Sequence, residues 1–200
     1  MALWKQLVVF LGFAFLATQT VLACDPGVLA DYGLMNATSG ADFTSTSFEP
    51  KNIPVGGPVT LVANFFTQFQ GLTGLSISSL YFQLAAGALV PLHYHPRGSE
   101  LFFVLTGTWY VGFIDTSGKL FDSYLQPGDQ FVFPVGLTHF QLVTSKTTAT
   151  GFSGFNSALP GLFLLSTTFE STPPVPDSIL EGTYNTDSKT IDMLRKGLMG

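Results

Sequence analysis

The 200-residue chain is poor in cysteine, histidine and charge, with one cysteine, three histidines and 10% charged residues. A single cysteine, Cys24, cannot form a disulfide within the chain. Lysine and arginine number 8 against 13 aspartate and glutamate residues, which gives a formal net charge of -5. Because such a chain offers no basic stripe to neutralise phosphates, we expect no nucleic-acid partner.

Charged residues that favour helices are scarce over most of the chain, whereas phenylalanine occurs 20 times. Aromatic and β-branched runs alternate with glycine, serine, threonine and proline, which predicts an all-β fold. The length suits one domain with a sizeable core, and we find no internal repeat that would indicate a second domain.

Residues 1–23 have the pattern of a secretory signal peptide. Lys5 supplies a positive start, residues 7–17 form an apolar run, and Ala23 is a small residue at the expected cleavage site. The apolar run is short for crossing a bilayer, so we expect a secreted protein without a membrane span. One alternative stays open: the segment ending at Cys24 also fits a bacterial lipoprotein signal, in which that cysteine carries lipid.

Turn residues divide the rest of the chain into segments that we expect to be strands. Short strands and turns are expected across residues 42–67. A long alternating run covers residues 100–115, with interruptions at Gly107 and Gly112 where the sheet would need to bend. The other expected strands cover residues 75–84, 119–125, 130–133, 138–143, 148–155 and 162–168.

The three histidines and one glutamate fall in two segments of the most apolar part of the chain. His93 and His95 are two residues apart in an extended run, which places both imidazoles on one face of a strand. Glu100 would face the other way on an unbroken strand, but residues 96–98 supply a turn or bulge that restores the shared face. A proline–glycine turn just before His139 brings the third imidazole to the start of another strand.

Burying three imidazoles and a carboxylate in an apolar region is costly unless the four groups share a partner. We therefore favour a metal site over four separately hydrogen-bonded core or rim residues. These ligands leave two positions open on an octahedral ion, which is typical of catalytic sites. A divalent ion would give the site a net charge of about +1 and attract a small anionic or radical substrate. Histidine and carboxylate ligands admit manganese, iron, zinc, nickel or copper.

The two segments resemble the two sequence motifs of the cupin family. Residues 87–107 have its glycine, His-x-His, glutamate and glycine at the family spacing, and residues 128–139 have its glycine, Pro-x-Gly and histidine. Within the cupins, residues 91–100, 133–141 and 155–161 are similar to germin-like proteins and the related spherulins.

The resemblance implies a single jelly-roll β-barrel with short C-terminal α-helices over residues 43–200, preceded by an N-terminal arm over residues 24–42. It implies manganese as the metal and secretion to the extracellular space, the apoplast or the cell wall. It also implies a homo-oligomer, because germins form hexamers as trimers of dimers. The chain departs from plant germins in lacking the cysteine pair of their N-terminal segment. The implied ligands are His93, His95, Glu100 and His139.

Two germin activities are implied, superoxide dismutation and oxalate oxidation, and the residues favour the first. Oxalate oxidases present asparagines to the substrate at positions that match Leu80 and Val90 here. Val143 stands where an asparagine often closes the second motif. A carboxylate substrate would lose hydrogen bonds that orient it. A small shift of register near Leu80 would weaken this argument, because Ser78 and Ser79 lie beside it.

Two other classes of function stay open. The chain could be a metal-bearing storage or structural protein of a cell wall or spore coat, or a cupin dioxygenase or isomerase acting on a small organic substrate. Gln141 lies two residues after His139 and should face the same interior. It would either orient metal-bound water or line the barrel as a polar residue without a catalytic part.

The expected N-terminal arm carries the glycosylation sequon Asn36-Ala37-Thr38. A secreted chain would pass through the compartment in which asparagines are glycosylated. A three-residue pattern also arises by chance, so occupancy of Asn36 stays open.

The last thirty residues change character and predict two short helices. Asp177 or Ser178 is expected to cap the first helix, and Ser188 the second, which would cover residues 189–198. The spacing leaves open whether the apolar stripe of the second helix packs on its own domain or on another subunit. That stripe consists of Ile191, Leu194 and Leu198.

Overall fold

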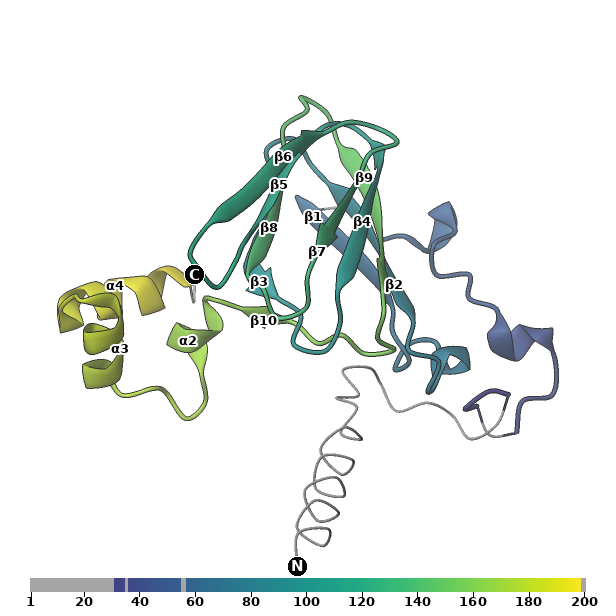
Figure 1. The fold of residues 1–200 in the computed structure, drawn as a ribbon, viewed down its shortest axis with the longest axis horizontal. Helices are drawn as coiled ribbons and strands as arrows, with labels where there is room; N and C mark the ends of the chain where they lie inside the picture. The colour runs from purple at the N-terminus through teal and green to yellow at the C-terminus, as the bar shows by residue number, and fades with distance from the viewer. Residues whose placement is uncertain (1–30, 35, 55–56, 199–200) are drawn as a thin grey trace, which may run out of the picture.

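The computed structural model describes residues 31–34, 36–54 and 57–198. The expected signal peptide (residues 1–23) and Cys24 lie outside the described residues. Two five-stranded antiparallel sheets face each other, and short helices follow them at the C-terminal end (Figure 1). The prediction of an all-β jelly roll with short C-terminal helices is confirmed. Within the described residues, no helix has the length and apolar character to cross a membrane.

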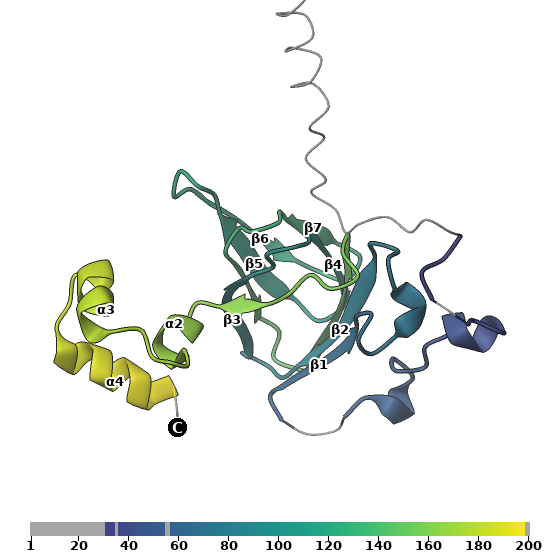
Figure 2. The ribbon, with the colours of Figure 1, turned by 90° about the horizontal axis from the view of Figure 1, so that it is seen from below.

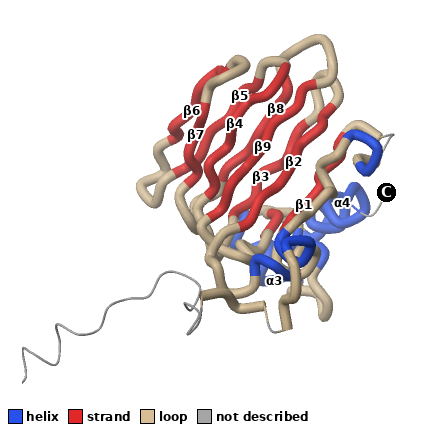
Figure 3. The backbone as a smooth tube through the Cα atoms, turned by 90° about the vertical axis from the view of Figure 1, so that its right-hand side faces the viewer, coloured by secondary structure: helices blue, strands red, loops and turns tan. Residues whose placement is uncertain are grey.

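The first sheet has the strand order β1-β2-β9-β4-β7, and the second has the order β10-β3-β8-β5-β6. The strands of each sheet lie side by side along much of the barrel (Figure 3). The bounds in the first sheet are β1 Val59–Asn64, β2 Ser78–Leu84, β9 Ala149–Phe155, β4 Glu100–Thr106 and β7 Gln130–Phe133. Those in the second are β10 Phe163–Leu164, β3 Leu89–Tyr94, β8 His139–Val143, β5 Trp109–Ile114 and β6 Leu120–Leu125.

The core lies between the two sheets, because alternate side chains of each strand point inward. In β2 and β9 every second residue is buried over the whole strand. Phe82, Phe102 and Trp109 are buried and pack edge to face, with ring centroids 5.0 to 6.5 Å apart. The buried core cluster comprises Leu80, Phe82, Leu84, Val90, Phe102, Val104, Trp109, Val111, Leu125, Phe133, Val143, Ala149 and Phe155.

The predicted long run over residues 100–115 is divided between the two sheets at Gly107. Gly107 has φ +74°, and a Cβ there would lie 2.5 Å from the Cβ of Ala149, so only glycine fits this crossing point. The expected bend at Gly112 is wrong, since β5 pairs in regular register with β6 and β8 through this residue. Gly112 instead makes room for the side chains of Asp122 and Phe140, which a Cβ would meet at 3.0 and 3.2 Å.

The expected strand over residues 162–168 is much shorter than predicted. β10 has two residues and pairs only with His93 and Tyr94 at the end of β3. The chain then turns into helix α2, Thr167–Glu170, where the hydroxyl of Thr168 donates to the carbonyl of Leu165 at 2.8 Å. The apolar pattern of residues 162–168 does not show where β3 ends, and the end of β3 limits the length of β10.

Helices α3 (Asp177–Tyr184) and α4 (Ser188–Leu198) form a lobe beside the barrel (Figures 1 and 2). The cap predictions are wrong. Asp177 is the first residue of α3 and accepts from the Arg195 guanidinium, while α4 is capped by Asp187, whose Oδ1 accepts from the amide of Thr190 at 2.8 Å. The hydrogen bonds from Thr190 lower the pKa of the Asp187 carboxyl. In the predicted stripe of α4, Ile191 is buried within the chain, but Leu194 and Leu198 are 42% and 40% exposed.

The segment before β1 covers part of the outer face of the first sheet. It contains the 3-10 turns η1 (Gly40–Phe43) and η2 (Pro50–Asn52), and a third turn, η3 (Gln70–Leu72), follows β1. Phe48 packs on Tyr81 and Phe152, and Ser45 and Ser47 donate to the amide oxygen of Asn64. These contacts hold the segment without a disulfide. Asn36 is exposed in a turn, so its glycosylation stays a prediction.

Candidate metal centre

The structure brings the four predicted ligand residues together inside the barrel. One nitrogen or oxygen atom from each of His93, His95, Glu100 and His139 lies within 4.8 Å of the other three. Glu100 and His139 are 1% exposed, and His93 and His95 are 3% and 5% exposed. A buried group of three imidazoles and one carboxylate has the composition and spacing to hold a metal ion.

The four residues come from both sheets. His93 lies in β3 and pairs in register with His139, the first residue of β8, while His95 directly follows β3. Glu100 begins β4 in the opposite sheet. The sequence predicted that the turn over residues 96–98 restores a shared strand face. In the structure this turn carries the chain across the barrel to the other sheet, from which the carboxylate points back toward the imidazoles.

Each imidazole is oriented by a backbone carbonyl. The Nδ1 atom of His93 lies 2.7 Å from the carbonyl oxygen of Pro91, and that of His139 lies 2.8 Å from the carbonyl oxygen of Leu137. His95 uses the carbonyl of Gly161 in the same way. Since carbonyl oxygens only accept, all three Nδ1 atoms carry the proton and donate. Every Nε2 atom is then free to act as a ligand.

The Glu100 carboxylate divides its two oxygens between different tasks. Oε1 accepts a 2.5 Å hydrogen bond from the hydroxyl of Ser153 and a 3.2 Å bond from the amide of Gln141. Oε2 lies 3.1 Å from Nε2 of His95 and 3.3 Å from Nε2 of His139. One oxygen is thus anchored to the protein, and the other faces the imidazoles.

This arrangement fits a cation. With their Nδ1 atoms protonated, the neutral imidazoles turn lone pairs toward a carboxylate oxygen that also only accepts. The centre therefore needs positive charge, either as extra protons on the imidazoles or as a metal ion shared by the four atoms. The Oε1 atom of Gln141 is also buried without a hydrogen-bond partner among the described residues, which leaves room for a donor such as bound water.

Gln141 and Ser153 refine what the sequence predicted. The structure places Gln141 in the interior as expected, but its amide contacts the Glu100 carboxylate, and its role toward bound water stays a prediction. Ser153 was missed altogether. The signal was present, because in β9 it is the one hydroxyl residue on an inward face formed otherwise by Ala149, Gly151 and Phe155.

Aromatic rings fix two of the imidazoles from the side. Phe133 stacks on His139 with ring centroids 4.4 Å apart, and Phe155 packs edge-on against His95 at 4.9 Å.

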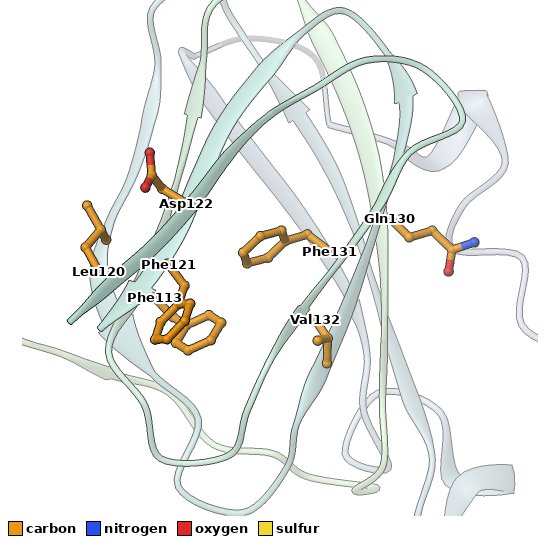
Figure 4. A pocket seen from close by; sticks show the side chains of 7 residues that line it. All are labelled: Phe113, Leu120, Phe121, Asp122, Gln130, Phe131 and Val132. Carbon is orange, nitrogen blue, oxygen red and sulfur yellow. The ribbon is translucent and has the colours of Figure 1, made fainter. Parts of the chain in front are cut away.

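A hollow of about 580 Å³ lies between β6 and β7, and its lining includes Phe131, which contacts Phe133. Figure 4 shows the stacked rings of Phe113 and Phe121 in this hollow, with Gln130 pointing away from them. None of the four clustered residues lines it.

Burial and neighbouring charge shift the pKa values of two members of the cluster. Burial, together with the neighbouring His139, lowers the pKa of His93 to about 4, so the imidazole of His93 is neutral at physiological pH. Burial alone would raise the pKa of Glu100. The close approach of His139 and His95 to its Oε2 atom outweighs burial and holds the pKa of that carboxyl well below its usual range.

We expect the metal-free protein to lose stability as the pH falls from 7 to 5. The unfolded chain binds a proton at His93 below about pH 6.5, whereas the folded chain resists this until about pH 4. The free energy of unfolding therefore decreases within this window, by about 2 kcal/mol between pH 7 and pH 5. Urea midpoints of the chelator-treated protein at pH 7 and pH 5 measure the effect. A His93→Gln protein should show a smaller drop, and an equal or larger drop would contradict the assignment.

We expect Ser153→Ala and Gln141→Leu proteins to bind metal about 10–100-fold more weakly than the wild-type protein, because the Glu100 carboxylate loses an anchor in each. Competition with a fluorescent chelator measures the affinity. Ser79→Ala is the matched control, since Ser79 lies in β2 on the outer face of the same sheet. Equal affinities in all of these proteins would show that neither anchor matters.

The comparisons with known proteins agree with the geometry. A profile of the cupin family matches residues 45–192. Germin-like protein 9-3 of Oryza sativa subsp. japonica is 34% identical over 204 residues, covering 96% of this chain and 94% of its own length. Germin-like protein subfamily 2 member 1 of Arabidopsis thaliana is 40% identical over 168 residues, covering 84% and 68%. A recombinant oxalate oxidase in complex with glycolate superposes with a TM-score of 0.80 at 25% identity, covering 86% of this chain and 97% of its own.

Two packed antiparallel sheets that enclose three histidines and a glutamate define a jelly-roll protein with a buried metal-binding cluster. The order of the sequence motifs, the fold and the similarity to known proteins together identify the family. This chain belongs to the cupin family and, within it, to the germin-like proteins.

Proposed function

We propose that this germin-like protein is a secreted manganese oxidoreductase that removes superoxide. His93, His95, Glu100 and His139 would hold the ion, as the convergence of their ligand atoms within 4.8 Å supports. That convergence is the observation on which the proposal rests. Bound manganese would supply a one-electron redox couple at these ligands. The overall reaction converts two superoxide ions and two protons into dioxygen and hydrogen peroxide.

The chain's own residues support this chemistry by fixing the ligands. The carbonyls of Pro91, Leu137 and Gly161 hold protons on Nδ1 of the three imidazoles. Ser153 and Gln141 hold the carboxylate. No side-chain nucleophile is needed, and a site with net positive charge attracts a small anion.

Oxalate is the less favoured substrate. Leu80 and Val90, which match asparagines of oxalate oxidases in the resemblance, both line the cavity beside the cluster. The Ser78 hydroxyl does not replace them, because it donates to the carbonyl of Ser157 at 2.6 Å. Among the described residues that line this cavity, a dicarboxylate would therefore find no side-chain amide to orient its second carboxylate.

We further propose that the protein is a homo-oligomer. The resemblance to germins implies an assembly of this kind, and the half-exposed Leu194 and Leu198 on α4 would provide an apolar surface for it. Analytical ultracentrifugation of the secreted protein tests this proposal, and a monomer at micromolar concentration would contradict it.

Elemental analysis of protein from a secretory host, without added metal, tests the function together with a superoxide assay. We expect about one manganese ion per chain and superoxide removal that chelation abolishes. Bound metal without activity toward superoxide, oxalate or phenols would favour a storage or structural role. An organic molecule that co-purifies and is converted would favour a cupin dioxygenase. Protein that carries no transition metal would contradict the proposal.

A further inference from the structure

A cavity of about 350 Å³ opens beside the histidine–glutamate cluster, and we call it the chamber. Its walls come from β1 and β2 of one sheet, from β3 of the other, and from the segment that leads into β10. His93, His95 and Glu100 lie at its inner end. A molecule in the chamber would therefore reach the face of the cluster on which a metal ion would be accessible.

The chamber offers a ligand very few polar contacts. Among the described residues that line it, His93, His95 and Glu100 are the only ones with nitrogen or oxygen in their side chains. The Nδ1 atoms of both histidines are already bonded to backbone carbonyls, one of them that of Gly161 in the chamber wall. A second polar group on a ligand would be buried without a partner, which is costly.

The remaining walls are aliphatic or aromatic. Leu80 and Phe82 face the chamber from β2 and Val90 from β3, and each is less than 10% exposed. Around the chamber, Val59, Leu61, Leu89 and Leu162 also contribute to the lining and are 39% to 58% exposed. The free energy falls when an apolar body covers apolar side chains that would otherwise contact water.

We infer that the chamber binds monoanionic organic molecules with an apolar body, such as aromatic carboxylates, with the anionic head at the cluster and the body against the apolar walls. The inference rests on the proposed metal, because a divalent ion beside Glu100 leaves a net positive charge of about one for the head. A cavity of this size with one polar end is typical of a site for a small organic ligand. Such a molecule would compete with superoxide for the centre.

Ligand binding to the zinc-loaded protein tests the inference without redox turnover. Isothermal titration calorimetry compares benzoate with acetate, which share the head but differ in the apolar body. We expect benzoate to bind about 30-fold more tightly, which corresponds to about 2 kcal/mol for burying a phenyl ring. Affinity should also rise from acetate to butyrate to hexanoate. Equal affinities along this series would overturn the inference.

Variants locate the bound body. We expect Leu80→Asn to lower the benzoate affinity about 10-fold while the acetate affinity changes little, because the polar side chain disturbs only the apolar wall. Leu89→Asn, in a half-exposed position at the chamber, provides the same test with less risk to folding. Val132→Asn is the matched control, since Val132 is 53% exposed and does not line the chamber. If the control weakens benzoate as much as the chamber variants, the ligand binds elsewhere.

The outcomes separate this inference from the proposed function. Tight benzoate binding to zinc-loaded protein, together with manganese-loaded protein that leaves superoxide untouched, would support the chamber and refute the superoxide activity. Superoxide removal that benzoate does not inhibit, with no preference for benzoate over acetate, would refute the chamber and leave the activity standing. Protein that binds no divalent metal would refute both.

Discussion

A His95→Ala protein is expected to lose more than 100-fold in metal affinity, a larger loss than the roughly 10–100-fold that removal of a supporting residue causes. The reason is geometric. Nε2 of His95 lies 3.1 Å from Oε2 of Glu100, and its ring is fixed by the carbonyl of Gly161 and by Phe155. Alanine removes one of the four ligand atoms, and among the described residues that line the chamber only His93 and Glu100, already in the cluster, carry ligand atoms. Superoxide removal is expected to fall to the background rate of the buffer.

Leu92→Ala is the control for this experiment. Leu92 lies in β3, one residue before His93, but it is 40% exposed and does not line the chamber. We expect its metal content and activity to match those of the wild-type protein. Metal content is measured after dialysis against a weak chelator, and folding is checked by circular dichroism. A folded His95→Ala protein that retains metal at wild-type affinity would remove this residue from the site.

A Phe102→Ala protein is expected to lose about 3–5 kcal/mol of unfolding free energy. Phe102 is fully buried in β4, two residues after Glu100, and packs edge-on against Phe82 and Trp109 at 5.3 and 5.0 Å. The removed ring leaves a cavity at the centre of the sandwich, because both neighbours are held in their own strands. Urea denaturation followed by tryptophan fluorescence measures the loss.

Leu105→Ala tests whether position within the strand decides the effect. Leu105 belongs to the same strand but is 41% exposed, so its truncation should cost less than about 1 kcal/mol. A similar loss in the two proteins would mean that the interior of the barrel is not where the alternating pattern places it.

The sequence predicted the four clustered residues because their chemistry is rare in this chain. The three histidines of a chain with 10% charged residues lie at the spacing His-x-His and at one distant turn, so a shared partner was the simplest reason to bury them. The same pattern could not show that Glu100 reaches the cluster from the opposite sheet. That arrangement depends on pairing between β4 and β9, which are about fifty residues apart in the chain.

What supports the ligands was harder to predict, because it is not a sequence pattern. The carbonyl of Gly161 reaches His95 across 66 residues, and Ser153 reaches Glu100 across 53. The sequence marks Ser153 only as the one hydroxyl residue on the inward face of β9, and it does not show which group that hydroxyl contacts. The cap of α4 was missed for a simpler reason: Asp187 and Ser188 are both good capping residues, and the amide of Thr190 donates to the aspartate.

Anomalous X-ray diffraction from crystals of the secreted protein is the most direct measurement of the central claim. We predict a single strong peak at the manganese absorption edge, within bonding distance of Nε2 of His93, His95 and His139 and of one oxygen of Glu100. A metal peak elsewhere in the molecule would contradict the claim. So would protein never exposed to chelator in which the four side chains point away from one another and no ion lies between them.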